Sequence, residues 1–164
     1  LFERVQAGDE IRIKGAQGGY YFDPENQPEP LLLISAGSGI TPMMSISRFL
    51  KASGNSRPVK FLYGARSEAD IIFRGECEQF ANEQAWFDYR VCLSQPGESW
   101  TGECGRIDPE KLAEWYPELS TYRFFLCGPS DFMQVLQSAL VAAGVSENRI
   151  HTEQFHSSSA PAVR

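Results

Sequence analysis

Short apolar runs alternate with segments of helical character over most of this chain. The apolar runs are strand-sized, as expected of strands buried on both faces of a parallel sheet, and they lie at 31–35, 59–64, 86–94 and 122–128, with a shorter fifth near 150–155. Helix signals, namely apolar spacing, N-caps or terminal glycines, fall between them at 41–50, 75–82, 108–115 and 130–143. Strand–helix–strand units form right-handed crossovers. The sequence therefore predicts an α/β fold with an open five-stranded parallel sheet and helices on both faces.

The two ends of the chain differ from this central pattern. In residues 9–22, apolar and polar residues alternate through Ile11 and Ile13, and three glycines then interrupt the alternation. This pattern predicts a strand, a turn and an aromatic strand end. Residues 23–30 read DPENQPEP and predict a linker. The polar residues 156–164 predict a flexible tail or connector.

Composition and charge exclude several classes of function. The 15 basic residues against 21 acidic ones give a net charge of −6, and no basic cluster is present, which argues against nucleic-acid binding. No apolar run is long enough to span a bilayer, and the first residues lack the layout of a signal peptide. The 4 cysteines are irregularly spaced, which argues against a zinc site or a disulfide framework and favours a reducing, cytoplasmic setting.

A glycine-rich turn follows the first central strand, in AGSGITPMMS. Gly37 and Gly39 allow close approach to the backbone, Thr41 is expected to cap the next helix, and Pro42 fits its first position. Such a helix start attracts anions such as a pyrophosphate. The lysine of a P-loop and the flanking glycines of a nucleophile elbow are absent. A tight turn without a ligand is the alternative.

A second turn follows the fourth strand, in LCGPSDFM. Cys127 is expected at the carboxyl end of the strand, where Gly128 and Pro129 redirect the chain. A cysteine in this position is also commonly a small buried hydrophobe, which remains an alternative. Because parallel strands end at one edge of a sheet, both turns are expected to open onto one crevice.

Five segments in order carry a family resemblance: AGSGITPMMS, LYGARSEADIIFRGE, VCLSQP, FLCGPSDFM and HTEQF. Together they resemble the NAD(P)H domain of the ferredoxin–NADP reductase superfamily, above all the reductase components of oxygenases and related flavin and iron–sulfur reductases. The preceding VQAGDEIRIKGAQGGYYF resembles the last strands of that family's antiparallel flavin-binding β-barrel. The resemblance implies a barrel remnant and linker at 1–28, an NAD(P)H-binding domain at 29–155 and a tail at 156–164.

The resemblance also implies site residues. Cys127 would lie against the nicotinamide, and Glu153 near the same reaction centre, although a solvated charge is the alternative for Glu153. Phe155 would cover the flavin ring or, alternatively, pack in the core. The residues expected to bind the cofactor are Gly37, Ser38, Gly39, Ile40, Thr41, Pro42, Arg66, Ser94, Gln95, Gly128, Pro129 and Phe155.

The resemblance implies hydride transfer from NAD(P)H to FAD, and then one-electron transfer to a ferredoxin-like or haem partner. NADH is favoured because Gln95 stands where NADPH-specific members often carry arginine, although Arg66 is a candidate for a 2′-phosphate or else a surface arginine. The family's FAD motif would precede Leu1, so we expect this chain alone not to retain FAD. The polar tail suggests a [2Fe–2S] module after Arg164. The alternative function is a non-catalytic dinucleotide sensor or docking module.

Overall fold

A six-stranded sheet, in which every strand pair is parallel, forms the centre of the molecule. The structure is a computed structural model that describes residues 6–12, 15 and 18–154. The strands are β1 (Leu31–Ala36), β2 (Val59–Ala65), β3 (Phe87–Leu93), β4 (Glu103–Cys104), β5 (Arg123–Cys127) and β6 (Ile150–Glu153). They lie in the order β4-β3-β2-β1-β5-β6.

The predicted α/β architecture is confirmed, but the prediction of five strands is wrong. The additional strand, β4, contains only two residues at the edge of the sheet. Alternation needs several residues to become visible, so a strand this short leaves no pattern in the sequence. The five longer strands all coincide with the predicted apolar runs.

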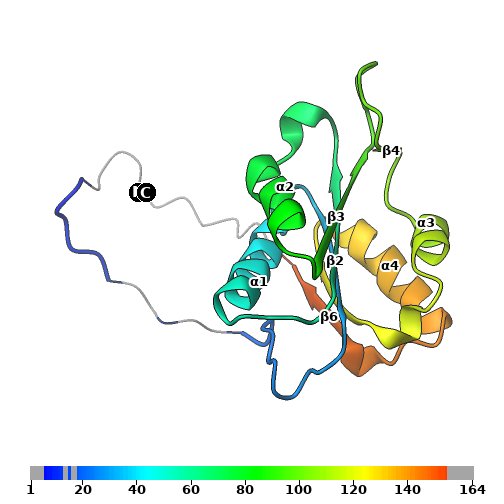
Figure 1. Cartoon of the computed structure of the whole chain (residues 1–164), viewed down its shortest axis with the longest axis horizontal. Coiled ribbons are helices and arrows are strands. Elements are labelled where there is room, and N and C mark those ends of the chain that lie inside the picture. Colours follow the sequence, from blue (N-terminus) through cyan, green and yellow to red (C-terminus); the bar gives the residue numbers. More distant parts are fainter. Residues whose placement is uncertain (1–5, 13–14, 16–17, 155–164) are drawn as a thin grey trace, which may run out of the picture.

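Helices cover both faces of the sheet, as predicted (Figure 1). Helices α1 (Ile40–Ala52) and α2 (Arg74–Glu83) lie on one face, and α3 (Pro109–Trp115) and α4 (Ser130–Ala142) lie on the other. Each face has its own hydrophobic cluster. Met44 of α1 and Phe80 of α2 belong to the first, and Leu112 of α3 and Leu136 of α4 belong to the second. Burial on both faces explains why the central strands read as continuous apolar runs.

The strand order reverses direction at β1. Strand β2 pairs with one side of β1, whereas β5, much later in the chain, pairs with the other side. The connections that leave β1 and β5 therefore diverge to opposite faces of the sheet. In open parallel sheets a crevice forms at such a switch point, beyond the carboxyl ends of the strands.

The strand predicted within residues 9–22 is not observed in the described part of that segment. Residues 6–12, 15 and 18–22 form turns and irregular chain. A strand needs a neighbouring strand to satisfy its backbone hydrogen bonds, and none pairs with these residues. Tyr20 and Phe22 instead pack edge-on against Phe125, with ring centroids 5.4 and 6.2 Å apart.

Residues 23–30 form neither helix nor strand, yet they are held against the domain. Arg57 donates hydrogen bonds to the carbonyl oxygens of Gln27 and Pro24. The largely buried Arg123 of β5 donates from Nε to Glu29 at 3.0 Å and from a second guanidinium nitrogen at 3.2 Å. These contacts fix the predicted linker to the amino ends of the sheet.

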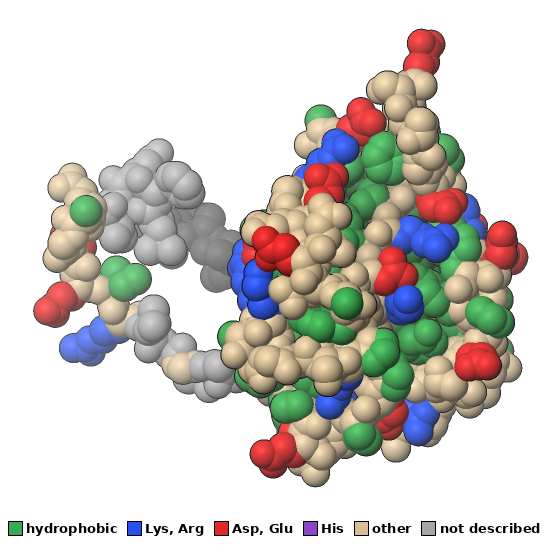
Figure 2. Space-filling view, in the orientation of Figure 1, with side chains coloured by type: hydrophobic (Ala, Val, Ile, Leu, Met, Phe, Trp, Pro, Cys, Tyr) green, Lys and Arg blue, Asp and Glu red, His purple; other side chains and the backbone are tan. Residues whose placement is uncertain are grey.

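The described helices include none with the length and apolar character needed to cross a membrane. The space-filling view shows acidic and basic side chains interspersed on the visible face (Figure 2). It also shows the segment between β3 and β4 projecting from the body of the domain.

Candidate functional site

The two glycine turns meet at the switch point of the sheet. Gly39 is packed so closely against the turn after β5 that a Cβ at this position would lie 2.1 Å from the Cys127 carbonyl oxygen and 2.8 Å from the Gly128 nitrogen. Gly37 has a φ of +55°, in the left-handed region that favours glycine. The expectation that both turns open onto one region is therefore met by a direct backbone contact.

The start of α1 differs from the prediction. A 3₁₀ turn at Gly37–Gly39 leads directly into α1 at Ile40, so Thr41 is not the N-cap and Pro42 is the third helical residue. Pro42 lacks the N–H that would bond to the carbonyl of Ser38, four residues earlier. The Thr41 hydroxyl donates to that carbonyl at 3.0 Å instead. Pro42 is still compatible with the first turn of α1, because the Thr41 hydroxyl supplies a hydrogen bond to the Ser38 carbonyl in place of the N–H that Pro42 lacks.

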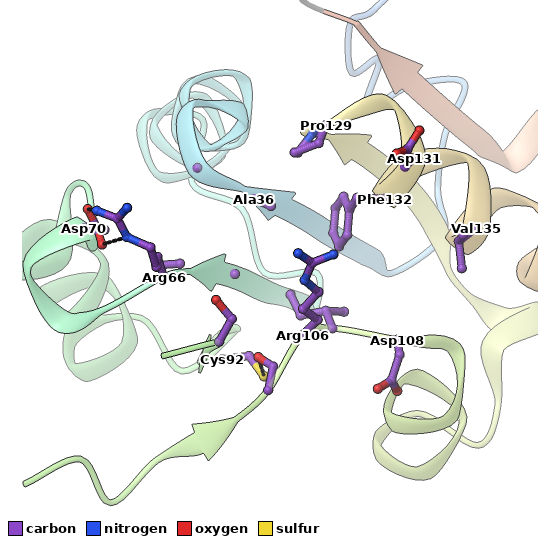
Figure 3. Close-up of a pocket in the computed structure, with 16 residues that line it drawn as sticks. Ala36, Arg66, Asp70, Cys92, Arg106, Asp108, Pro129, Asp131, Phe132 and Val135 are labelled. Carbon is purple, nitrogen blue, oxygen red and sulfur yellow. Dashed lines mark hydrogen bonds and ion pairs between the residues drawn. The ribbon is translucent and has the colours of Figure 1, made fainter. Parts of the chain in front are cut away.

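A cavity of about 790 Å³ lies beyond the carboxyl ends of β1, β2 and β3 and beside the start of α4 (Figure 3). Four of the predicted cofactor-binding residues line it: Gly37, Arg66, Ser94 and Pro129. The other lining residues are Ala36, Gly64, Ala65, Asp70, Cys92, Gly105, Arg106, Ile107, Asp108, Asp131, Phe132 and Val135.

The remaining predicted binding residues that the structure describes are not part of the cavity wall. Gly39 and Ile40 are buried beneath the turn, and Ser38 and Thr41 are exposed on its other side. Gly128 supports the wall, since a Cβ there would lie 3.1 Å from the Phe132 ring. Pro42 is in α1 and Gln95 is in the exposed loop after β3. Phe155 lies outside the described residues.

Cys127 and Glu153 are opposite each other on β5 and β6, so the structure brings the two predicted reaction-centre residues together. They do not line the cavity, and Cys127 is completely buried. Burial, and secondarily the charge of Glu153, raises the pKa of the Cys127 thiol to about 11. The thiol is therefore protonated at neutral pH, which suits a positioning role better than a nucleophilic one.

Tyr20 lies near Cys127. It packs against the hydrophobic cluster that contains Cys127, and its hydroxyl donates to the Met43 sulfur at 3.8 Å. Burial raises the pKa of Tyr20, and the nearby Cys127 and Glu153 raise it further. Tyr20 was missed from sequence because its aromatic neighbours read simply as the end of a strand.

The loops after β2 and β3 are tied together on the other side of the cavity. The backbone N–H of Gln95 donates to the Arg66 carbonyl at 2.7 Å, and that of Ser94 donates to Ala65 at 3.0 Å. Arg66 and Gln95, which the family resemblance associates with recognition of a 2′-phosphate on the adenosine ribose, are thus neighbours. Arg66 itself turns towards Asp70, and its Nε lies 3.2 Å from the Asp70 carboxylate (Figure 3).

Arg106 was missed by the sequence analysis. Its exposed side chain extends across the cavity towards Phe132 (Figure 3). Among the described residues, no carboxylate lies within ion-pairing distance of its guanidinium. The only local signal was its position just before the helix-start pair Asp108–Pro109, where Asp108 accepts a hydrogen bond from the Lys111 N–H at 2.9 Å.

The cavity suits a ligand that has both planar apolar groups and an anionic centre. Ala36, Ile107, Phe132 and Val135 supply apolar walls. Arg66 is paired with Asp70, so Arg106 supplies the positive charge, while Asp108 and Asp131 add carboxylates elsewhere on the wall. Pockets of 300–1,000 Å³ typically hold small molecules and cofactors. A dinucleotide has the required chemistry, with flat rings joined by a pyrophosphate.

Comparison with known proteins agrees with this geometry. The family described as "Oxidoreductase NAD-binding domain" matches residues 33–138, which include both glycine turns and the walls of the cavity. The chain belongs to this family. The resemblance to ferredoxin–NADP reductases and oxygenase reductases is thereby confirmed.

Several curated relatives of this NAD-binding domain are named as reductases. It is 33% identical over 153 residues to cytochrome b5 reductase 4 of Mus musculus, covering 91% of this chain and 29% of the relative. It is 31% identical over 159 residues to ferredoxin–NADP reductase B of Sorangium cellulosum (strain So ce56), covering 93% and 64%. The chain therefore spans less than two thirds of either relative.

Solved structures give the same result. The CS-b5R domains of human Ncb5or (NAD+ form) superimpose with a TM-score of 0.80 at 30% identity, covering 92% of this chain and 44% of that one. The Amycolatopsis cytochrome P450 reductase GcoB superimposes with a TM-score of 0.79 at 28% identity, covering 94% and 46%. The nucleotide-binding unit is shared, while the larger relatives extend well beyond it.

Proposed function

We propose that this domain binds NADH in the cavity and presents its nicotinamide for hydride transfer to FAD. The contact between Gly39 and the Cys127–Gly128 backbone carries the proposal. It joins the two turns at the switch point, so that one extended dinucleotide can lie from the cavity towards the carboxyl end of β5. The printed names of the relatives, which include cytochrome b5 and ferredoxin–NADP reductases, support a reductase.

The protein's contribution to the reaction is binding, orientation and exclusion of water, because the hydride chemistry belongs to the cofactors. The turn at Gly37 lets the dinucleotide approach the backbone closely. Arg106 balances the pyrophosphate charge, and Phe132 contributes an apolar wall. Cys127 lies at the carboxyl end of β5, towards which we place the nicotinamide ring.

FAD supplies the hydride acceptor when it is bound. Cys127 and Glu153 are opposite each other on β5 and β6, and we place the reactive edge of the flavin beside them. Electrons would then pass singly to an iron–sulfur or haem partner, in keeping with the relatives' names.

Calorimetric titration with NADH tests the binding step. Arg106→Gln is expected to weaken NADH binding about tenfold, or about 1.4 kcal/mol, through loss of a charge-assisted hydrogen bond. Arg74→Gln is the matched control, because Arg74 is an exposed arginine of α2 outside the cavity. Equal affinities for NADH in wild type and Arg106→Gln would contradict this use of the cavity.

The second candidate function, a non-catalytic dinucleotide sensor, is favoured by one observation: Cys127 is fully buried and does not line the cavity. The two functions differ in the colour of a longer protein that contains this domain. A reductase is yellow and bleaches when NADH is added anaerobically. A sensor without a flavin partner is colourless and still binds NADH.

A further inference from the structure

The Arg66–Asp70 ion pair lies at the rim of the cavity, where the family resemblance predicts the adenosine end of the cofactor. We propose that Asp70 is a specificity-determining residue, which disfavours NADPH by holding the Arg66 guanidinium away from a 2′-phosphate. The inference rests on the proposed binding of NADH in the cavity. It identifies a residue that the sequence analysis did not single out.

Asp70 is held firmly in its position. The Ser67 hydroxyl and backbone N–H donate to Asp70 Oδ2 at 2.6 and 3.1 Å, which forms a capping box at the short helical turn Glu68–Asp70. Arg66 then donates from Nε to Oδ2 at 3.2 Å and from a terminal nitrogen to Oδ1 at 3.4 Å. Because Ser67 fixes the carboxylate, the carboxylate sets the direction of the more exposed Arg66 side chain.

The position of this pair matches the adenosine end of a bound dinucleotide. If the nicotinamide lies towards Cys127 on β5, the other end lies across β1 towards β2 and β3. Arg66 follows β2 directly, and its carbonyl accepts the Gln95 N–H after β3 at 2.7 Å. A 2′-phosphate would therefore arrive beside Arg66 and Asp70.

The charges at this position oppose a phosphate. The Asp70 carboxylate offsets the Arg66 guanidinium there, whereas the other lining carboxylates, Asp108 and Asp131, lie on the far side of the cavity (Figure 3). Hydrogen bonds from Ser67, and next those from Arg66, lower the pKa of Asp70, which keeps it ionised at neutral pH. Arg106 is directed towards Phe132, away from this pair (Figure 3). It therefore balances the charge of the pyrophosphate, which NADH and NADPH share.

Removal of the Asp70 charge should release Arg66 without removing the cap. In Asp70→Asn the amide oxygen still accepts from Ser67, while the ion pair with Arg66 is lost. Arginine is the preferred partner of phosphate groups. We expect the NADPH affinity to rise about tenfold relative to the NADH affinity, as measured by calorimetric titration of each nucleotide into the whole chain.

Two further variants make the test specific. Glu78→Gln is the matched control, because Glu78 is an exposed carboxylate of α2 paired with Arg74 at 2.9 Å outside the cavity, and it should leave the ratio unchanged. The double variant Asp70→Asn with Arg66→Gln should lose the gain. Arg66→Gln alone should also leave the ratio at the wild-type value, because Asp70 already occupies Arg66.

The outcomes separate this inference from the proposed function. An unchanged NADPH-to-NADH ratio in Asp70→Asn overturns the role of Asp70 but leaves NADH binding intact. A selective loss of NADPH affinity in Arg66→Gln overturns it as well, and this measurement remains available if Asp70→Asn fails to fold. Absence of NADH binding by the wild-type chain overturns the proposed function together with the inference.

Discussion

A methyl group at Gly39 should separate the two turns that form the site. In Gly39→Ala the new Cβ would lie 2.1 Å from the Cys127 carbonyl oxygen, 2.5 Å from its carbon and 2.8 Å from the Gly128 nitrogen. These are backbone atoms, which cannot rotate away as a flexible side chain can. Restoring van der Waals contact requires a backbone shift of roughly 1 Å at the junction of β1 and β5.

This shift is costly because it disturbs the middle of the sheet. Overpacking of a core usually costs about 1–3 kcal/mol, and we expect the upper end, about 3 kcal/mol, because the clash involves only backbone. A loss of 3 kcal/mol corresponds to a fall of roughly 6–12 °C in Tm for a domain of this size. Calorimetric unfolding measures it, and NADH titration below the transition measures the loss of binding.

Gly75→Ala is the matched control. Gly75 lies in the first turn of α2, has no positive φ, and offers open space to a Cβ. Alanine favours a helix by about 0.8–1 kcal/mol over glycine, so the Tm should stay constant or rise slightly. If Gly39→Ala unfolds at the wild-type temperature and binds NADH equally well, the account of two interlocked turns is refuted.

Three further predictions concern buried groups. In a Cys104→Ser background, Tyr20→Ala should increase the rate at which iodoacetamide labels Cys127; an unchanged rate would show that Tyr20 does not cover the thiol. Between pH 6 and 9, the rate of flavin reduction in a longer protein should show no thiol titration, because the pKa of Cys127 is raised to about 11. Hydrogen bonds from Arg123 lower the pKa of Glu29 below its ordinary value of 4.5. The stabilisation of the folded domain by ionised Glu29 is therefore complete above pH 4.5 and is lost as the pH falls through the lowered value. Urea unfolding of Glu29→Gln should show a shallower loss of stability with acid than the wild type.

The sequence predicts the strand and helix order well because each element is long enough to show its own period. The run before Gly37 is buried on both sides and reads as wholly apolar, whereas α4 shows apolar residues at helical spacing. Strand β4 is too short for either pattern. The strand expected near Ile11 is absent from the described residues because a strand depends on a partner, which local sequence does not reveal.

The sequence predicted site residues only where the backbone of a turn forms the wall of the cavity. Gly37 and Pro129 have recognisable roles in turns, and both line the cavity. Arg106 and Phe132 were not predicted as site residues, and they meet only because the crossovers bring α4 and the chain after β4 to one edge of the sheet. Tyr20 packs against the cluster that contains Cys127, which lies more than 100 positions later in the sequence, and no local pattern encodes this packing.

The attachment of Glu29 to Arg123 has a mechanical consequence. Removing one partner of this ion pair, to which Arg149 adds a contact at 3.3 Å from Glu29, would leave an uncompensated charge in a largely buried site, so the attachment is costly to break. A polypeptide segment that joins the domain through residues 23–30 is therefore held in a fixed orientation relative to the sheet. The distance between two redox groups on either side of such a linker would be fixed by the fold rather than averaged over the conformations of a flexible linker.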